Sequence, residues 1–255
     1  MSETPRLPSV PVLYLRAVLF WLGWASSTVL LASCLVLMAW LPYRVRYPVA
    51  ALWPRFNMWW LALTCDLNYR VIGREHIAEV SGSGIIMAKH QSTWETMALQ
   101  RVFPRTSWVL KRELMWIPFF GWGLALTKPI AIRRSAGRQA VTQLVNQGQS
   151  RLPEGLWVVV FPEGTRVAPG QAGKYKIGGA VLATQSGYPV VPVAHNAGEF
   201  WPRHGFIKRP GTITVIIGEP IDPRGLTPEA LTAQVRDWIE ARMDEIALTP
   251  RKTRD

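Results

Sequence analysis

The pattern of hydrophobic positions divides the chain into an apolar first part and an alternating second part. Residues 17–41 form a run of 25 residues without a charged side chain. A helix of that length is sufficient to cross the ~30 Å hydrocarbon core of a bilayer with some tilt. A cleaved signal peptide, lipoprotein processing at Cys34 and a buried core helix are the alternatives, and all three fit the length of the run less well. The pattern therefore predicts a membrane helix over residues 17–41.

Residues 48–66 are rich in aromatic side chains but are interrupted by polar and helix-breaking residues. The aromatic members are Trp53, Phe56, Trp59 and Trp60, and the interrupting residues are Pro54, Arg55 and Asp66. Such segments are typical of the headgroup layer of a membrane. We expect an interfacial helix here, so that residues 1–69 form a membrane-embedded helical hairpin.

After residue 70, short apolar runs alternate with helical periods. The expected strands are residues 68–72, 84–89, 107–110, 129–132, 156–161, 189–194 and 212–217. Residues 135–152 have a helical apolar face, and Thr227 followed by Pro228 is typical of a helix start. Alternating strands and helices predict an α/β fold, a mixed sheet flanked by helices, over residues 70–255.

The charges are concentrated in the second part. The chain has 29 Lys and Arg against 17 Asp and Glu, a net charge of +12, yet it is 49% hydrophobic. This hydrophobicity excludes a disordered chain. Residues 105–176 contain eleven basic and three acidic residues, next to an apolar run at 114–124. The combination favours membrane lipids and phosphorylated groups over nucleic acid, and the positive-inside rule places the bulk of the chain on the cytoplasmic side of the cytoplasmic membrane.

A histidine follows the expected strand 84–89. His90 and Glu95 are five residues apart, which puts them about 140° apart on a regular helix, so they meet only if His90 precedes the first turn. A carboxylate on one imidazole nitrogen leaves the other free as a general base. Ser92 is a less favoured nucleophile nearby. The other histidines, His76, His195 and His204, have no carboxylate at useful spacing and are expected to be structural or exposed.

A second candidate loop follows the strand 156–161. Gly164 allows backbone amides to approach an anion, and Arg166 has a planar guanidinium suited to phosphate. No cluster of metal ligands is evident, and the two cysteines, Cys34 and Cys65, are too few for a zinc site or a disulfide framework.

Four short motifs follow one another between residues 90 and 196. They are His90 with Glu95; Lys111 before a Leu-x-x-Ile-Pro-x-x-Gly run, with Arg133 further on; Phe-Pro-Glu-Gly-Thr-Arg at 161–166, with Lys176 after it; and Val-Pro-Val at 191–193. In their order and spacing they resemble the 1-acylglycerol-3-phosphate acyltransferases. That family usually has aspartate where this chain has Glu95, one methylene longer.

The resemblance implies transfer of a fatty acyl group from acyl-CoA or acyl carrier protein to the sn-2 hydroxyl of lysophosphatidic acid, without a cofactor or metal. It implies His90 as general base with Glu95 as its partner. The expected substrate-binding residues are Lys111, Arg133, Glu163, Gly164, Thr165, Arg166 and Lys176. Another lyso-lipid acceptor, such as a lyso-ornithine lipid or a lysophospholipid, and a non-catalytic lipid-binding protein remain as alternatives.

Overall fold

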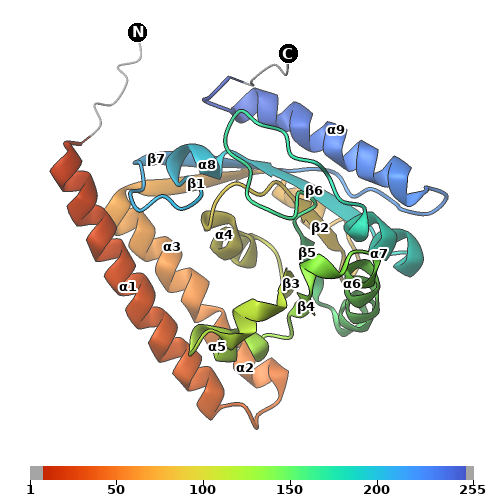
Figure 1. Ribbon diagram of the computed structural model, residues 1–255, viewed down its shortest axis with the longest axis horizontal. Coiled ribbons are helices and arrows are strands. Elements are labelled where there is room, and N and C mark those ends of the chain that lie inside the picture. Colours follow the sequence, from red (N-terminus) through yellow and green to blue (C-terminus); the bar gives the residue numbers. More distant parts are fainter. Residues whose placement is uncertain (1–7, 251–255) are drawn as a thin grey trace.

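A seven-stranded mixed sheet forms the centre of the protein, whose computed structural model describes residues 8–250 (Figure 1). The strands are β1 (Leu67–Ile72), β2 (Ile85–Ala88), β3 (Thr106–Lys111), β4 (Ile130–Ile132), β5 (Trp157–Val160), β6 (Val190–His195) and β7 (Gly211–Ile217). Their order across the sheet is β1-β7-β6-β2-β5-β3-β4. Neighbouring strands are parallel except β6 and β7, which are antiparallel, so β1 and β7 run opposite to the other five.

The seven predicted strands are confirmed, each within one residue at either end. The sequence pattern predicts these strands because both faces of the central strands are buried. In β2, Ile86 and Ala88 belong to one apolar cluster, whereas Ile85 and Met87 belong to the other. A strand buried on both faces reads as a continuous apolar run.

Two groups of helices cover the two faces of the sheet. The first group is α1 (Val10–Leu37), α3 (Leu52–Cys65) and α4 (Trp94–Val102), which pack with the cluster that contains Ile86. The second is α6 (Arg138–Arg151), α7 (Gly178–Ser186) and α9 (Pro228–Ile246), which pack with the cluster that contains Ile85. We call the first the cavity face, after a cavity described below, and the second the back face.

Shorter elements connect these layers. They are α2 (Tyr43–Ala50), α5 (Phe120–Ala125), α8 (Ala197–Phe200) and the 3-10 turns at Arg74–Ile77, Arg112–Trp116, Arg134–Ala136 and Leu152–Glu154. The predicted helix 135–152 is α6, preceded and followed by such turns. The predicted cap of the last helix is present, because Thr227 Oγ1 accepts a hydrogen bond from the Ala230 amide at 3.2 Å.

The N-terminal helices differ from their predicted ranges. α1 begins seven residues before the predicted range 17–41 and ends four residues before its end, at Leu37. The predicted helix 48–66 is two helices, α2 and α3, because Pro54 has no N–H to donate to the Ala50 carbonyl. Among residues 8–250, α1 alone has the length and the mean hydropathy, 1.7 over an 18-residue window, of a candidate membrane span.

One side of α1 belongs to the core of the sheet domain. Phe20 is fully buried and its ring packs edge-on against Trp201, with centroids 5.3 Å apart. The buried Lys208 Nζ lies 3.8 Å from the ring centroid of Trp21 and 4.3 Å from that of Phe20. The helix expected to be an anchor is therefore also a structural part of the domain that follows it.

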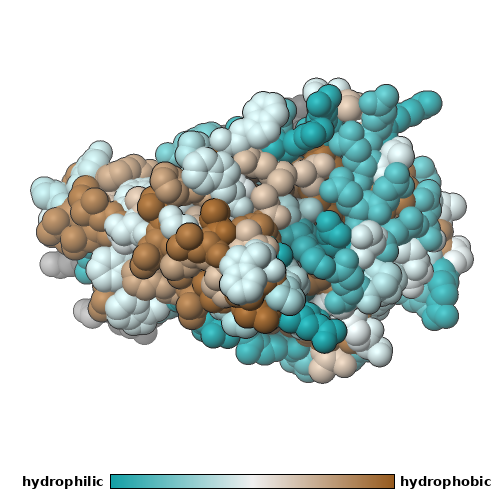
Figure 2. Space-filling view, turned by 90° about the horizontal axis from the view of Figure 1, so that it is seen from below, coloured by the Kyte–Doolittle hydropathy of each residue, from teal (hydrophilic) through white to brown (hydrophobic). Residues whose placement is uncertain are grey.

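The outer surfaces of the two faces differ in polarity. Beside the cavity face, most exposed side chains of α1, α3 and the segment around α5 are apolar; they include Leu15, Leu22, Leu30, Trp59, Leu63, Trp116 and Trp122. Figure 2 shows hydrophobic residues gathered on one side of the surface and hydrophilic residues on the other. On the back face, α9 exposes polar residues, among them Glu229, Gln234, Arg236, Asp237, Asp244 and Glu245.

Candidate active site

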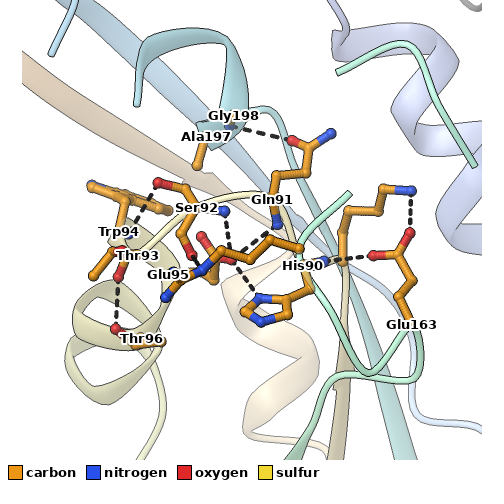
Figure 3. Close-up of polar contacts among 12 residues, drawn as sticks. His90, Gln91, Ser92, Thr93, Trp94, Glu95, Thr96, Glu163, Ala197 and Gly198 are labelled. Atoms are coloured by element: carbon orange, nitrogen blue, oxygen red, sulfur yellow. Dashed lines mark hydrogen bonds and ion pairs between the residues drawn. The ribbon is translucent and has the colours of Figure 1, made fainter. Parts of the chain in front are cut away.

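His90 lies in the turn between β2 and α4, on the cavity face of the sheet. Its Nδ1 is 2.8 Å from Glu95 Oε1 (Figure 3). The same oxygen accepts the backbone amides of Gln91, at 3.0 Å, and Ser92, at 2.8 Å. With Nδ1–H donating to the carboxylate, the neutral imidazole has its lone pair on Nε2, which has no hydrogen-bond partner among residues 8–250.

The start of α4 explains how residues five apart come together. The helix begins at Trp94, so His90 precedes it, as the predicted contact requires. Ser92 Oγ accepts the Trp94 amide at 3.1 Å while Glu95 accepts the Ser92 amide, a reciprocal arrangement similar to a capping box. The glutamate side chain is long enough to reach back over the turn, so the extra methylene is accommodated here.

The charge on Glu95 is stabilised in a fully buried position. Burial raises the pKa of its carboxyl, but the hydrogen bonds from the His90 imidazole and the Ser92 amide oppose burial, and the net pKa is below the ordinary value. Burial lowers the pKa of His195, which donates from Nε2 to the Lys89 carbonyl at 2.8 Å. We therefore assign Glu95 as ionised and His195 as neutral.

The His90 ring is held between this carboxylate and an aromatic side chain. It stacks on Phe161, with centroids 4.0 Å apart and ring planes 11° apart. His90 lines a cavity of about 320 Å³ that extends between the sheet and helices α1, α3 and α5. The lining is mostly apolar and aromatic, and it includes Trp24, Leu31, Leu35, Trp53, Trp108 and Leu124. Such a cavity suits an aliphatic chain whose reactive end lies beside the imidazole.

Two arginines line the same cavity. Arg166 donates from Nε to the Ser92 carbonyl at 2.8 Å, which holds it beside the His90 turn. Arg134 donates to the Gly164 carbonyl at 2.6 Å. Arg203 is close enough to lower the pKa of Arg166 further, after burial as the larger cause. These guanidiniums make one end of an otherwise apolar cavity positive and suited to phosphate.

The sequence motif predicts Arg133 as a substrate-binding residue, whereas in the structure its neighbour Arg134 lines the cavity. β4 ends at Ile132 and a 3-10 turn starts at Arg134, so one position decides which side chain faces the cavity. Arg133 is exposed and outside the described lining. The predicted strand 129–132 ends at the same residue as β4, but the periodicity does not contain the conformation of the 3-10 turn that follows, which decides which of the two arginines faces the cavity.

The other predicted binding residues occupy three kinds of position. Glu163 is buried behind His90, whose backbone amide donates to Glu163 Oε2 at 2.9 Å. Gly164 has φ +67°, its amide donates to the Phe161 carbonyl at 3.0 Å, and a Cβ there would lie 2.8 Å from Lys176 Nζ. Lys111, Thr165 and Lys176 are exposed and outside the described lining of the cavity. Of the predicted residues, the structure brings His90 and Arg166 to the cavity with Glu95 behind them.

The remaining candidates lie elsewhere. Ser92 is fully buried and its hydroxyl is used at the start of α4. A larger open groove of about 770 Å³ lies between β7 and α9, and its described lining includes His76 and Arg242 but none of the predicted site residues. Among residues 8–250, no group of three His, Cys, Asp or Glu side chains is placed to hold a metal ion.

Comparisons with known proteins agree on one family. Residues 68–196 match the family model described as acyltransferase. A 1-acyl-sn-glycerol-3-phosphate acyltransferase of Pseudomonas aeruginosa is 45% identical over 238 residues, covering 91% of this chain and 92% of that protein. The Saccharomyces cerevisiae protein of the same name is 32% identical, over 74% of this chain and 64% of its own length. The crystal structure of a 1-acyl-sn-glycerophosphate acyltransferase from Thermotoga maritima shares the fold, with a TM-score of 0.76, 22% identity and coverage of 93% and 97% of the two chains.

Proposed function

Because the chain belongs to the acyltransferase family, we propose that it transfers a fatty acyl group from a thioester to the sn-2 hydroxyl of 1-acylglycerol-3-phosphate, giving phosphatidic acid. The observation that carries this proposal is the juxtaposition of the His90–Glu95 pair, an apolar cavity and two arginines. A lipid acceptor with a phosphate needs these three features together. The names of the relatives from Pseudomonas and yeast support the same acceptor.

In the proposed mechanism His90 acts as general base. Nε2 takes the proton of the acceptor hydroxyl as its oxygen attacks the thioester carbonyl, and the tetrahedral intermediate collapses with loss of a thiolate. The imidazolium returns the proton to the thiolate, so ester and free thiol are the products. Glu95 holds Nδ1–H throughout and stabilises the transient imidazolium at 2.8 Å. No covalent acyl-enzyme is required, because donor and acceptor occupy one site.

The basic residues receive separate proposed roles. Arg166 and Arg134 bind the acceptor phosphate, since both line the cavity. Lys111, Arg133 and Lys176 are exposed basic residues and are assigned to the acidic donor, acyl-CoA or acyl carrier protein. Thr165 offers a backbone amide for the oxyanion next to Arg166, whereas the Gly164 amide is already engaged in the turn.

Membrane association agrees with the exposed apolar side chains of α1 and of the segment around α5. We place the hairpin of α1 and α3 in the cytoplasmic membrane, with the sheet domain on the cytoplasmic side. The acceptor and the phosphatidic acid product are themselves membrane lipids, so the apolar mouth of the cavity would receive them without transfer through water.

The test is a panel of donors and acceptors with the purified protein, with thiol release as the measurement. Turnover with 1-acylglycerol-3-phosphate is expected, with acyl-CoA and acylated carrier protein compared as donors. Faster turnover with a lyso-ornithine lipid or a lysophospholipid would reassign the acceptor. Vesicle binding without any thiol release would contradict enzymatic transfer.

A further inference from the structure

A buried cluster of charges lies directly behind His90, on the back face of the sheet. Lys89 is 1% exposed, and its Nζ is 2.7 Å from Glu163 Oε1 and 2.9 Å from Glu240 Oε1. It also donates to the Gln171 carbonyl at 3.3 Å. Successive residues of a strand point to opposite faces, so the residue before His90 necessarily projects to the back. The proposed acyl transfer leaves Lys89 and Glu240 without a role.

Glu163 connects this cluster to His90. One carboxylate oxygen accepts the His90 amide at 2.9 Å, and the other accepts Lys89 Nζ and the Gly173 amide, the latter at 3.2 Å. Burial raises the pKa of Glu163, and the Lys89 ammonium opposes this. The net pKa of Glu163 stays raised, and Lys89 is the charge that favours the ionised form of this carboxylate. The contact of Glu163 with the His90 amide is drawn in Figure 3.

The same cluster fixes the loop that carries Arg166. Between β5 and α7 the chain has no helix or strand, so hydrogen bonds from side chains have to define its path. Glu163, Gln171 and Gly173 of this loop meet the Lys89 cluster. Tyr175, near the end of the loop, donates to Glu240 Oε1 at 2.9 Å, and Glu240 comes from α9.

One ammonium thus joins the end of β2, the loop 161–177 and the C-terminal helix. Loss of the ammonium would remove the Lys89 contact from both Glu163 and Glu240, which is unfavourable for the buried Glu163 carboxylate until it is protonated or the loop moves. Either response changes the partner of the His90 amide and the path of the loop to Arg166. The general base and a proposed phosphate ligand would be displaced together.

We propose that Lys89 and Glu240 are positioning residues. By linking Glu163 to helix α9, they fix the positions of His90 and of the loop 161–177, which carries Arg166, relative to each other. The inference rests on the proposed acyl transfer and adds to it two residues that do not touch the substrate. It makes helix α9, on the far side of the sheet from the cavity, part of the support of the active site.

The test compares Lys89→Met with Lys89→Arg, each assayed well below its own melting temperature. For K89M we expect kcat to fall about 50-fold and KM for the phosphorylated acceptor to rise about fivefold, since both His90 and Arg166 are displaced. K89R keeps the charge and several donors, so its kcat should stay within about fivefold of wild type. A folded K89M with wild-type kcat and KM would overturn the proposal, because a purely structural lysine changes only the melting temperature.

Glu240→Gln gives an independent answer if K89M does not fold. This variant keeps the Lys89–Glu163 pair, and we expect its kcat/KM to be about fivefold to tenfold lower than that of wild type. The control is Glu245→Gln, which removes an exposed ion pair with Arg242 on the same helix and should change kcat/KM less than twofold. In the K89M background, E240Q should add little further loss. Equal effects of E240Q and E245Q would overturn the proposal. A wild-type protein that transfers no acyl group to 1-acylglycerol-3-phosphate would contradict the proposed function and with it this inference. An active wild-type protein together with an E240Q variant of unchanged kcat/KM would contradict the inference alone.

Discussion

The two faces of the sheet are both covered by helices, yet they meet different surroundings. On the back face, α6, α7 and α9 bury Leu144, Leu182 and Val235 and expose polar side chains. On the cavity face, α1 and α3 leave a cavity of about 320 Å³ against the sheet and expose leucines and tryptophans on their outer side. The first arrangement is that of an ordinary soluble α/β domain, whereas the second is apolar on both its inner and its outer surface.

Because of this difference, the residues that stabilise the fold and the residues proposed to bind lipid lie on opposite faces of one sheet. A strand can serve both because its side chains alternate between the faces. Directly after β2, the side chain of Lys89 pairs with Glu163 and Glu240 on the back face, whereas the side chain of His90 lines the cavity. Changes on the cavity face should therefore alter catalysis and membrane binding, and changes in the apolar core of the back face, away from Lys89 and Glu240, should alter folding.

Replacement of His90 by alanine is the largest expected effect. Without a general base at the cavity, kcat should fall about 1000-fold or more, while the melting temperature stays near that of wild type. Steady-state thiol release measures the rate. His76→Ala, at the edge of the sheet near β7, is the control and should remain active. Near-normal turnover of H90A would show that another group removes the proton.

Truncation of Leu182 on the back face should act on folding alone. Leu182 is fully buried in α7, so Leu182→Ala should lower the free energy of unfolding by about 2–4 kcal/mol. Denaturant titration measures the loss. The kcat and KM of the folded variant should match wild type. A large loss of kcat in fully folded L182A would mean that the back-face core also sets the catalytic geometry.

Arg134→Ala should raise KM for 1-acylglycerol-3-phosphate about tenfold with a smaller change in kcat, because a phosphate contact is lost. Arg133→Ala is the matched control, one residue away but outside the described lining of the cavity. Initial rates against acceptor concentration measure both. If R133A raises this KM more than R134A, the phosphate is bound on the outer surface instead.

Removal of exposed aromatic side chains should weaken membrane binding. Trp116 is 71% exposed and Trp122 is 48% exposed. The double replacement by serine should reduce partitioning into phosphatidylglycerol-containing vesicles about tenfold. Co-sedimentation with vesicles measures it, and Leu248→Ser, an exposed apolar residue after α9, is the control. Equal losses for both variants would contradict a membrane contact confined to the side of the cavity face.

The smallest expected effect concerns pH. Burial lowers the pKa of His195 from 6.5, so the folded protein keeps this imidazole neutral while the unfolded chain binds a proton below that pH. Its contribution to stability is complete above pH 6.5 and is lost as the pH falls through the folded pKa. The melting temperature should therefore decrease between pH 7 and pH 5, and less so in His195→Gln. An identical decrease in H195Q would assign the pH dependence to other groups.

The strands and the His90–Glu95 contact could be predicted because local patterns determine them. Seven apolar runs define the strands, and the position of Ser92 allows His90 to precede the helix. The start of α1 differs from the predicted range because the uncharged run begins only after Arg16, although one charged residue does not end a long apolar helix. The choice of Arg134 over Arg133, the cavity and the Lys89 cluster depend on contacts between distant segments, which periodicity does not contain.

The cage of Phe20, Trp21, Trp201 and Phe206 around Lys208 limits how the protein can be shortened. Burial there lowers the pKa of Lys208 to about 7, so the ammonium depends on ring faces that α1 supplies. A chain cut after residue 42 would lose two of the four rings and open the core to water at Trp201. Deletion of α1 should therefore give an aggregating fragment rather than a soluble enzyme, and detergent or lipid will be needed throughout purification.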